Sequence, residues 1–399
     1  MSTPASLSRR RNYSGPAFLS YGFRPFFLGG AAWAALAVLL WLPLYFGEFA
    51  LPTAVRPHDW HVHEMLYGYV AAVIAGFLLT AIPNWTGRLP VNGTPLAALF
   101  ALWLGGRLAV MLSAKIGPAL AATIDVTFLV ALAAVALREI VAGRNWRNLR
   151  VLAVIGLLIA GNVTFHLETA WRGYSEYGAR IGLAAIIFLI TLIGGRIVPS
   201  FTRNWLARRP PGRLPAPFGR FDGLCMAVGA VALAGWIAAA EHQVTGLLLV
   251  AAGLLHAARL ARWAGERTTS DRLVLVLHVG YAFVPLGFLL AGSAVFWSAV
   301  PPGAAIHAWG AGAIATMTLA VMTRASLGHT GRPLAATPGT QLIYGLVVAA
   351  ALLRIVAAFE PSLFLYHAAA FAWIAAFGGF VVSYGPLLIG MQPVWSRRS

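Results

Sequence analysis

The chain has 399 residues, of which 59% are hydrophobic and only 10% charged, and its mean hydropathy is +0.77. Because an ordinary soluble domain carries about 25% charged residues, this composition excludes a water-soluble globular fold and a disordered chain. It also excludes a bacterial outer-membrane barrel, whose strands alternate apolar and polar residues. The net charge of +17 would suggest a nucleic-acid partner in a soluble protein. Here we expect no nucleic acid, because arginines also mark one side of a membrane.

The apolar runs predict an all-α, polytopic membrane protein with about twelve transmembrane helices. A spanning helix needs about 20 apolar residues, and twelve such runs follow one another along the chain. We expect a cytoplasmic N-terminal segment at 1–25 without a signal peptide, a single twelve-helix domain at 26–393 and a cytoplasmic tail at 394–399. The predicted spans are 26–47, 61–82, 94–114, 117–138, 150–167, 178–199, 221–240, 244–263, 272–293, 303–324, 340–359 and 364–390.

The distribution of basic residues predicts the orientation of these spans. If the N-terminus is cytoplasmic, 23 of the 29 lysines and arginines fall on the cytoplasmic side. Only four fall on the opposite side: Arg56, Lys115, Arg172 and Arg180. Because cytoplasmic loops carry the excess of Lys and Arg, we expect both termini in the cytoplasm and an even number of spans.

An internal repeat is visible when the chain is divided into three groups of four helices. His63 and His307 each lie 23 residues before the Thr of a Thr-Gly-Arg sequence, and each has a glycine five residues further on. The helix that follows each of them carries one arginine inside an apolar run, Arg107 or Arg354. The sixth span resembles the second at its end but has no histidine at its start. These agreements favour a repeat.

Ionisable residues inside a membrane are costly and are functional candidates by default. Five histidines fall near the predicted outer ends of their helices, and neutral imidazole is a common ligand of copper, zinc and iron. His61 and His63 point about 200° apart on a helix, so they could serve two different sites and could bind one ion only if the start of the helix is unwound. The alternative is that these histidines are solvated by lipid head groups. The outer-side candidates for metal ligands are His61, His63, His166, His307 and His367.

The two buried arginines and two deeper histidines are further candidates. Arg107 and Arg354 could hold the propionates of a heme, because guanidinium binds carboxylates. The alternative for Arg107 is an ion pair with Asp125 on the next helix. His256 and His278 lie in the inner half, where they either are satisfied by hydrogen bonds in a tight bundle or serve a second heme or a proton path.

Several short motifs resemble the NnrS family over nearly the whole chain. They are Phe23-Arg24-Pro25-Phe26-Phe27, Trp60 to Met65, Ile82 to Gly87, Gly195-Arg196 with Pro199 to Thr202, Leu277 to Tyr281, and His307 to Leu334. The resemblance implies a bacterial inner-membrane protein that carries heme and copper and is linked to nitric oxide metabolism and nitrosative stress. The twelve spans and the histidines on spans 2 and 10 are also similar to heme–copper oxidases. Span 6 here has no histidine, so a copper site would use other positions.

On this basis we place a b-type heme between spans 2 and 10, with His63 and His307 as axial ligands. Residues around Gly310 and Gly312 make span 10 thin beside His307, which leaves room for a porphyrin. A competing placement uses His278, alone or with His256. For copper we expect His61, His166 and His367, since the single cysteine, Cys225, lies near the other side.

Two functions remain open from the sequence. One is a heme and copper redox protein that handles or responds to nitric oxide. The other is a transporter of a small solute with no redox cofactor, whose buried charges would line a substrate path. Twelve spans suit both.

Overall fold

The structure is a computed structural model that describes residues 13–390. Within that range twelve helical stretches are long and apolar enough to cross a membrane, and no strand occurs. Each stretch overlaps one predicted span, so the all-α, twelve-helix prediction is confirmed. The predicted tail 394–399 and residues 1–12 of the predicted N-terminal segment lie outside the described residues. The chain divides into two compact units, which are described separately.

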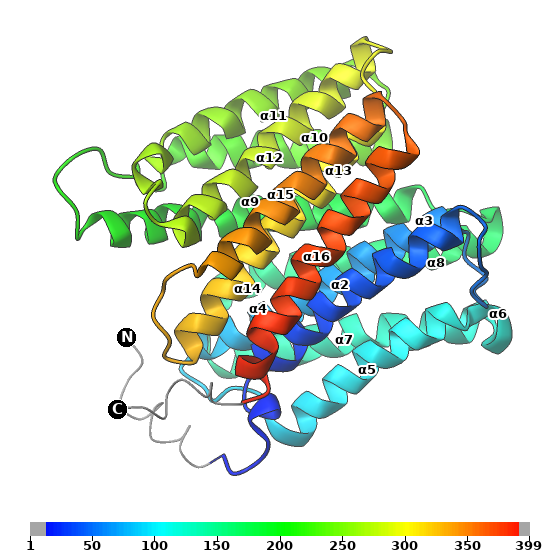
Figure 1. The fold of residues 1–399 in the computed structure, drawn as a ribbon, viewed down its shortest axis with the longest axis horizontal. Helices are drawn as coiled ribbons and strands as arrows, with labels where there is room; N and C mark the ends of the chain where they lie inside the picture. Colours follow the sequence, from blue (N-terminus) through cyan, green and yellow to red (C-terminus); the bar gives the residue numbers. More distant parts are fainter. Residues whose placement is uncertain (1–12, 391–399) are drawn as a thin grey trace. The chain divides into compact units, whose positions relative to one another are not determined.

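Unit 1 comprises 13–182, 325–332 and 380–390 of the described chain. In Figure 1 its first helices run from blue to cyan, with α5 beside α7 and α2 beside α4. Short 3-10 turns occur at η1 (Ala17–Leu19) and η3 (Trp146–Asn148). The helices of this part are α2 (Phe23–Tyr45), α3 (Pro57–His63), η2 (Glu64–Val70), α4 (Ala71–Thr86), α5 (Gly93–Met111), α6 (Ser113–Ile116), α7 (Pro118–Ala142), α8 (Leu149–Arg172) and the start of α9 (Tyr177–Leu206).

Unit 2 comprises 183–324 and 333–379 and takes the rest of α9. The helices α10, α11 and α12 run side by side, from green to yellow in Figure 1. A 3-10 turn, η4 (Gly265–Thr268), precedes α12. The remaining helices are α10 (Arg220–Ala238), α11 (Gln243–Ala261), α12 (Arg272–Phe296), α13 (Pro302–His307), η5 (Ala308–Ile314), α14 (Ala315–His329), α15 (Pro338–Phe359) and α16 (Leu363–Leu388). The last turns of α14 and α16 belong to unit 1.

Spans 2 and 10 share a local irregularity that the sequence spacing does not reveal. Both change from α-helix to π-helix directly after the repeated histidine, at Glu64–Val70 and at Ala308–Ile314. Each π segment has seven residues and contains the glycine five positions after the histidine. Short π segments inside α-helices are rare and occur often at functional sites. The described part of α9, by contrast, is a continuous α-helix.

The Thr-Gly-Arg sequences that end spans 2 and 10 also adopt one local structure. Thr86 and Thr330 each return a hydroxyl hydrogen bond to the carbonyl four residues earlier. Gly87 and Gly331 follow with φ of +70° and +71°, the left-handed conformation that stops helices and favours glycine. These shared features support the repeat between spans 2 and 10.

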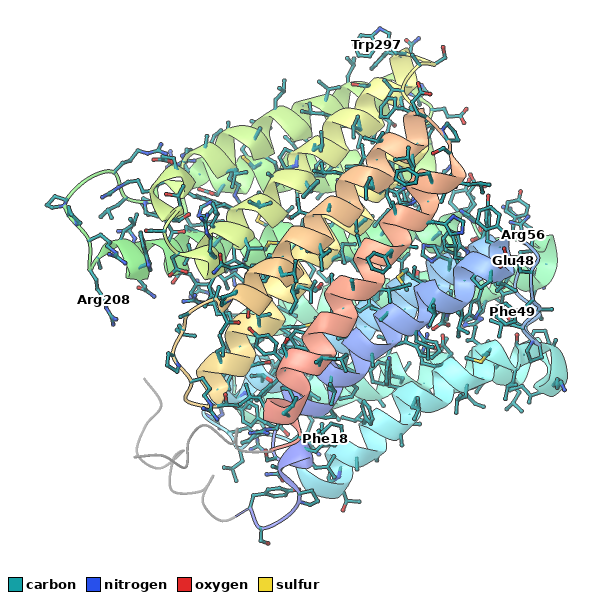
Figure 2. All side chains as sticks on the ribbon, in the orientation of Figure 1. Phe18, Glu48, Phe49, Arg56, Arg208 and Trp297 are labelled. Atoms are coloured by element: carbon teal, nitrogen blue, oxygen red, sulfur yellow. The ribbon has the colours of Figure 1, made fainter. Side chains whose placement is uncertain are left out.

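In each unit, the loops before and after a long helix lie at opposite ends of that helix, as the labelled residues in Figure 2 show. In unit 1, Phe18 lies before α2, whereas Glu48, Phe49 and Arg56 lie in the loop after it. In unit 2, Arg208 follows α9 and Trp297 follows α12. Within each unit, the labelled loops therefore lie at opposite ends of the helices, and the orientation that the arginine count predicts stays a prediction.

Candidate metal centre

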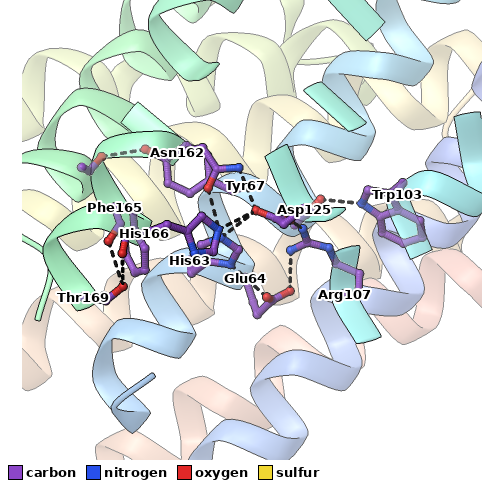
Figure 3. Close-up of polar contacts among 12 residues, drawn as sticks. His63, Glu64, Tyr67, Trp103, Arg107, Asp125, Asn162, Phe165, His166 and Thr169 are labelled. Carbon is purple, nitrogen blue, oxygen red and sulfur yellow. Dashed lines mark hydrogen bonds and ion pairs between the residues drawn. The ribbon is translucent and has the colours of Figure 1, made fainter. Parts of the chain in front are cut away.

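A buried polar cluster in unit 1 lies at the start of the η2 π-helix (Figure 3). His63 ends α3, Glu64 begins η2, and Arg107 reaches them from α5. Asp125 comes from α7 and His166 from α8. The first four side chains are 0–1% exposed, so each needs its partners inside the protein.

His63 faces oxygen acceptors with both ring nitrogens. Its Nδ1 lies 3.0 Å from Oε1 of Glu64. Its Nε2 lies 3.1 Å from Oδ2 of Asp125 and 3.2 Å from Oδ1 of Asn162. An ionised carboxylate only accepts hydrogen bonds, so Nδ1–H donates to Glu64. Nε2 then needs a positive centre between itself and Asp125, either a proton or a metal cation.

Arg107 holds the two carboxylates of the cluster. Its Nη1 donates to Oε2 of Glu64 at 2.8 Å, and its Nη2 forms a close ion pair with Asp125. The Trp33 indole donates to the same Glu64 oxygen at 2.7 Å. Of the two alternatives for Arg107, the described contacts therefore favour the ion pair with Asp125. A propionate role for Arg107 stays a prediction.

The charges of the cluster do not balance without one more cation. Glu64 and Asp125 supply two negative charges, and Arg107 supplies one positive charge. An uncompensated charge in the interior costs several kcal/mol. A proton on His63 or a bound metal ion removes that cost, so the donor set fits a cation.

Three side chains of the cluster form a set that could hold a metal ion. The ligand atoms of His63, Asp125 and His166 all lie within 4.8 Å of one another. Nε2 of His166 is 3.0 Å from Oδ2 of Asp125, and the Asn162 amide donates to the same oxygen at 2.8 Å. Two imidazoles and one carboxylate suit first-row transition metals. The Glu64 contact on the far ring nitrogen is the support that metal-binding histidines usually have.

Glycines bring the helices close enough for these contacts. A Cβ at Gly68 would lie 2.7 Å from both Nη1 of Arg107 and Oε2 of Glu64. A Cβ at Gly106 would lie 3.0 Å from Oδ1 of Asp125. Gly68 belongs to η2. The π segment and the absence of a side chain at Gly68 together allow the Arg107 guanidinium to reach Glu64.

A second group of contacts fixes α8 and the start of α9 beside the cluster. The Tyr67 hydroxyl donates to the carbonyl of Gly178 at 2.6 Å. The Glu168 carboxylate accepts the backbone N–H groups of Glu176, Tyr177 and Gly178. It thus satisfies the free amides at the start of α9, and it holds the helix that carries His166.

The other predicted outer histidines lie elsewhere. His61 stacks on Trp41 of α2, with ring centroids 4.1 Å apart, so it points to a different neighbour from His63, as its spacing predicts. His307 donates from Nδ1 to the carbonyl of Gly303 at 2.7 Å, and Nη2 of Arg354 lies 2.8 Å from its Nε2. His367 donates in the same way to the carbonyl of Leu363.

His307 and His63 belong to different units, so their pairing around one heme stays a prediction. The contact to Gly303 leaves the electron pair of His307 on Nε2, the usual ligand atom for heme iron. Arg354 stands beside that atom and also lies over the ring of Tyr366, 5.0 Å from its centroid. Because Arg354 donates to the electron pair on Nε2, iron would have to displace it there, and the heme role of this pair stays a prediction.

The inner histidines have hydrogen-bond partners. Nδ1 of His256 lies 2.9 Å from the Tyr281 hydroxyl, which also accepts from Nη1 of Arg259. His278 donates from Nε2 to Thr202, because the Thr202 proton is used on the carbonyl of Val198. For His256 the described contacts favour the hydrogen-bonded alternative. The heme role of both residues stays a prediction.

Sequence reasoning missed Glu64 and Asn162 as members of the cluster. An asparagine at 162 and a glutamate at 64 both interrupt apolar runs, which is a weak signal because single polar residues often cap or bend helices. Their joint role depends on the rotation of α3 and α8, which is not visible in the sequence.

Twelve apolar helices, together with a buried histidine–carboxylate group within unit 1, define a multi-span membrane protein with a candidate metal centre. The chain belongs to the NnrS family: the family profile, described as NnrS protein, matches residues 17–392. A comparison with curated proteins finds no match.

Proposed function

We propose that the chain is a heme- and copper-binding protein of the bacterial inner membrane that handles or responds to nitric oxide. In that role it would protect against nitrosative stress or support denitrification. Family membership supports this function. The observation that carries the metal part is the convergence of His63, Asp125 and His166 at a buried position with one negative charge in excess.

For copper we propose the set His63, Asp125 and His166. His63 and His166 were both predicted ligands, but the structure groups them with Asp125 and not with His61. Copper favours imidazole, and no cysteine belongs to the set. Bound there, the ion would supply the redox chemistry, while Glu64 would orient His63 and Arg107 would hold both carboxylates.

For heme we propose Nε2 of His307 as an iron ligand and Arg354 as a partner of a propionate. Nδ1–H of His307 is fixed on a backbone carbonyl, which sets the tautomer that a ligand needs. Nη2 of Arg354 donates to that nitrogen at 2.8 Å, so heme binding would require the guanidinium to turn from Nε2 to the propionate. Nitric oxide or a related small molecule would be the partner of these groups.

Metal analysis and optical spectroscopy of the purified protein test the proposal. Wild-type protein should contain copper and iron and show a Soret band that shifts on addition of nitric oxide. His63→Gln and His166→Gln should lose copper and keep the Soret band, whereas His307→Gln should lose the band. His58→Gln, at an exposed histidine on the same helix α3 as His63, is the matched control.

Other outcomes separate the alternatives. If His61→Gln removes copper as fully as His166→Gln, the set first predicted from the sequence is right. If His63→Gln and His307→Gln both abolish the Soret band, the two histidines share one heme. A colourless protein without metal that binds a solute would instead support a transporter.

A further inference from the structure

A cavity of about 340 Å³ lies in unit 1 at the end where α2 begins and α14 finishes, away from the metal centre. At about 30 Å³ per water it has room for roughly ten waters, far more than a bare ion needs. Its walls include the side chains of Ser20, Tyr21, Arg24, Asn92 and His329. Arg24 belongs to the Phe23 to Phe27 motif, and His329 lies near the end of the His307 to Leu334 motif; the proposed function uses neither residue.

The described lining of this cavity offers hydrogen-bond donors and a cation but no carboxylate. Arg24 supplies the positive charge of this lining. Its Nη1 donates to the carbonyls of Leu387 and Leu388, at 3.1 and 2.9 Å, which anchors the guanidinium to the end of α16. Guanidinium has five N–H donors, and among residues 13–390 no hydrogen-bond acceptor is recorded for Nε and Nη2, so these groups can serve a ligand. A lining of this kind suits an acceptor-rich, anionic group.

Ring packing fixes the imidazole of His329 at the cavity. Its centroid lies 5.6 Å from the ring of Tyr21 and 5.5 Å from the ring of Phe23, at interplanar angles of 31° and 33°. Both aromatic neighbours cover ring surface, so the imidazole presents its edge. An edge recognises oxygen atoms, whereas a flat ring ligand would need an open face. This geometry favours an oxyanion over a stacked aromatic ligand.

The surroundings of the cavity are positively charged. Residues 13–28, 84–92 and 325–334 contain three arginines and no Asp or Glu. Arg88 pairs with Glu139, at 2.5 Å, but the same carboxylate also pairs with Arg138, so the charge at this end of the helices stays positive. The cavity also lies where membrane-crossing helices end, at the level of lipid head groups.

We infer that this cavity binds the phosphate of an anionic phospholipid head group. Arg24 contacts the phosphate oxygens, and His329 with the neighbouring hydroxyl and amide groups accommodates the polar remainder of the head group. Basic pockets between transmembrane helices on the cytoplasmic side are known to take such head groups. The inference is independent of the proposed metal and nitric oxide functions.

Native mass spectrometry of the purified protein tests this site. The protein is reconstituted in nanodiscs of phosphatidylcholine with about one fifth phosphatidylglycerol and then released. Wild type should retain phosphatidylglycerol in preference to phosphatidylcholine. Arg24→Gln should lower its retention at least about tenfold, because a hydrogen bond to a charged group contributes about 1.5–3 kcal/mol. Arg332→Gln, at the same end but outside the lining, should retain it fully.

Two more variants keep the test decisive if Arg24→Gln fails to fold. His329→Phe preserves the ring packing and removes the ring nitrogens, and Leu89→Trp fills the cavity from an exposed wall position. Both variants should lower the retention of phosphatidylglycerol and leave the hydrogen bonds from Arg24 to α16 in place. Equal loss in Arg332→Gln would mean diffuse surface charge, and displacement by millimolar inorganic phosphate would mean a soluble phosphate site. Either result, or no preference for phosphatidylglycerol, overturns the inference.

Discussion

His63 and Glu64 are neighbours in the chain and hydrogen-bond through their side chains, with Nδ1 and Oε1 3.0 Å apart. Consecutive residues of a regular α-helix point about 100° apart. Here the contact falls where α3 becomes the η2 π-helix. The contact fixes the ring of His63 so that Nε2 faces Asp125, and it makes Glu64 the link between the histidine and Arg107.

Gly68→Ala should disturb the cluster because its Cβ would lie 2.7 Å from Arg107 and Glu64 atoms. Overpacking of this kind costs about 1–3 kcal/mol, so the variant should unfold at lower denaturant concentration and bind less metal. Gly310→Ala is the matched control, because it lies in the other π segment and its Cβ would meet nothing within 4 Å. Equal effects of the two substitutions would contradict the role of Gly68.

Arg107→Met should lower the free energy of unfolding by about 3–5 kcal/mol, since it leaves two buried carboxylates without their cation. Arg180→Met, which removes a partly exposed ion pair with Glu176, should cost less than about 1 kcal/mol. Unfolding of the purified proteins in detergent measures both. A small effect at Arg107 would mean that the carboxylates are protonated or hydrated.

Arg354→Leu should weaken heme binding by about tenfold, because a charged hydrogen bond to a propionate contributes about 1.5–3 kcal/mol. The guanidinium lies 2.8 Å from Nε2 of His307, so it would turn from that nitrogen to the propionate when iron is bound. Heme content and the Soret maximum are the measurements, and Arg147→Leu, at an exposed position, is the control. Unchanged heme content with an unchanged spectrum would make Arg354 a purely structural residue.

The loop around Gly173 should face the periplasm and the loop around Arg208 the cytoplasm. Gly173 ends α8 and Arg208 follows α9, so one span separates them. The expectation rests on 23 of 29 basic residues falling on the side of the N-terminus. Alkaline phosphatase inserted at 173 should be active, and at 208 inactive. The reverse result would invert the topology.

The ion pair between Arg213 and Glu266 should contribute stability only above mildly acidic pH. Two hydrogen bonds from the Arg213 guanidinium, at 3.0 and 2.6 Å, lower the pKa of Glu266 below its usual range. A carboxyl whose pKa is lower when folded stabilises above its unfolded pKa of about 4.3, and this contribution disappears as pH falls through the folded pKa. The pair is half exposed, so its effect is small.

Melting curves of wild type and Glu266→Gln between pH 7 and pH 3 measure that contribution. Wild type should melt slightly higher at pH 7, and the two curves should converge at the acid end. Glu241→Gln, at a carboxylate for which the structure records no ion pair with a described residue, should show no such convergence. A difference that persists at pH 3 would mean that Glu266 acts through packing and not through charge.

Much of the fold was predictable because its signals are local. Twelve apolar runs of about 20 residues produce twelve spanning helices, since lipid leaves the backbone no other partner than itself. The helix ends at Gly87 and Gly331 coincide with the two Thr-Gly-Arg sequences, which are visible in the sequence. The length of span 2 was underestimated, because helix α3 begins at Pro57, four residues before the predicted start. Proline at a first helical position fits there without losing a hydrogen bond.

The candidate site was only partly predictable. The sequence by itself determined that His63, His166 and Arg107 lie inside a membrane protein and that spans 2 and 10 repeat one pattern, because hydrophobicity and residue spacing are properties of single helices. Only the tertiary structure decided that His63 meets Asp125 and His166 rather than His61, and that Glu64 joins them. The contacts of Asp125 with His166 and with His63 join residues 41 and 62 positions apart, and they depend on the π segment after His63 and on how each helix is rotated about its axis. No local sequence pattern predicts that rotation, because it depends on contacts between helices. These contacts are the close approach at glycines and the ion pairs of the charged residues.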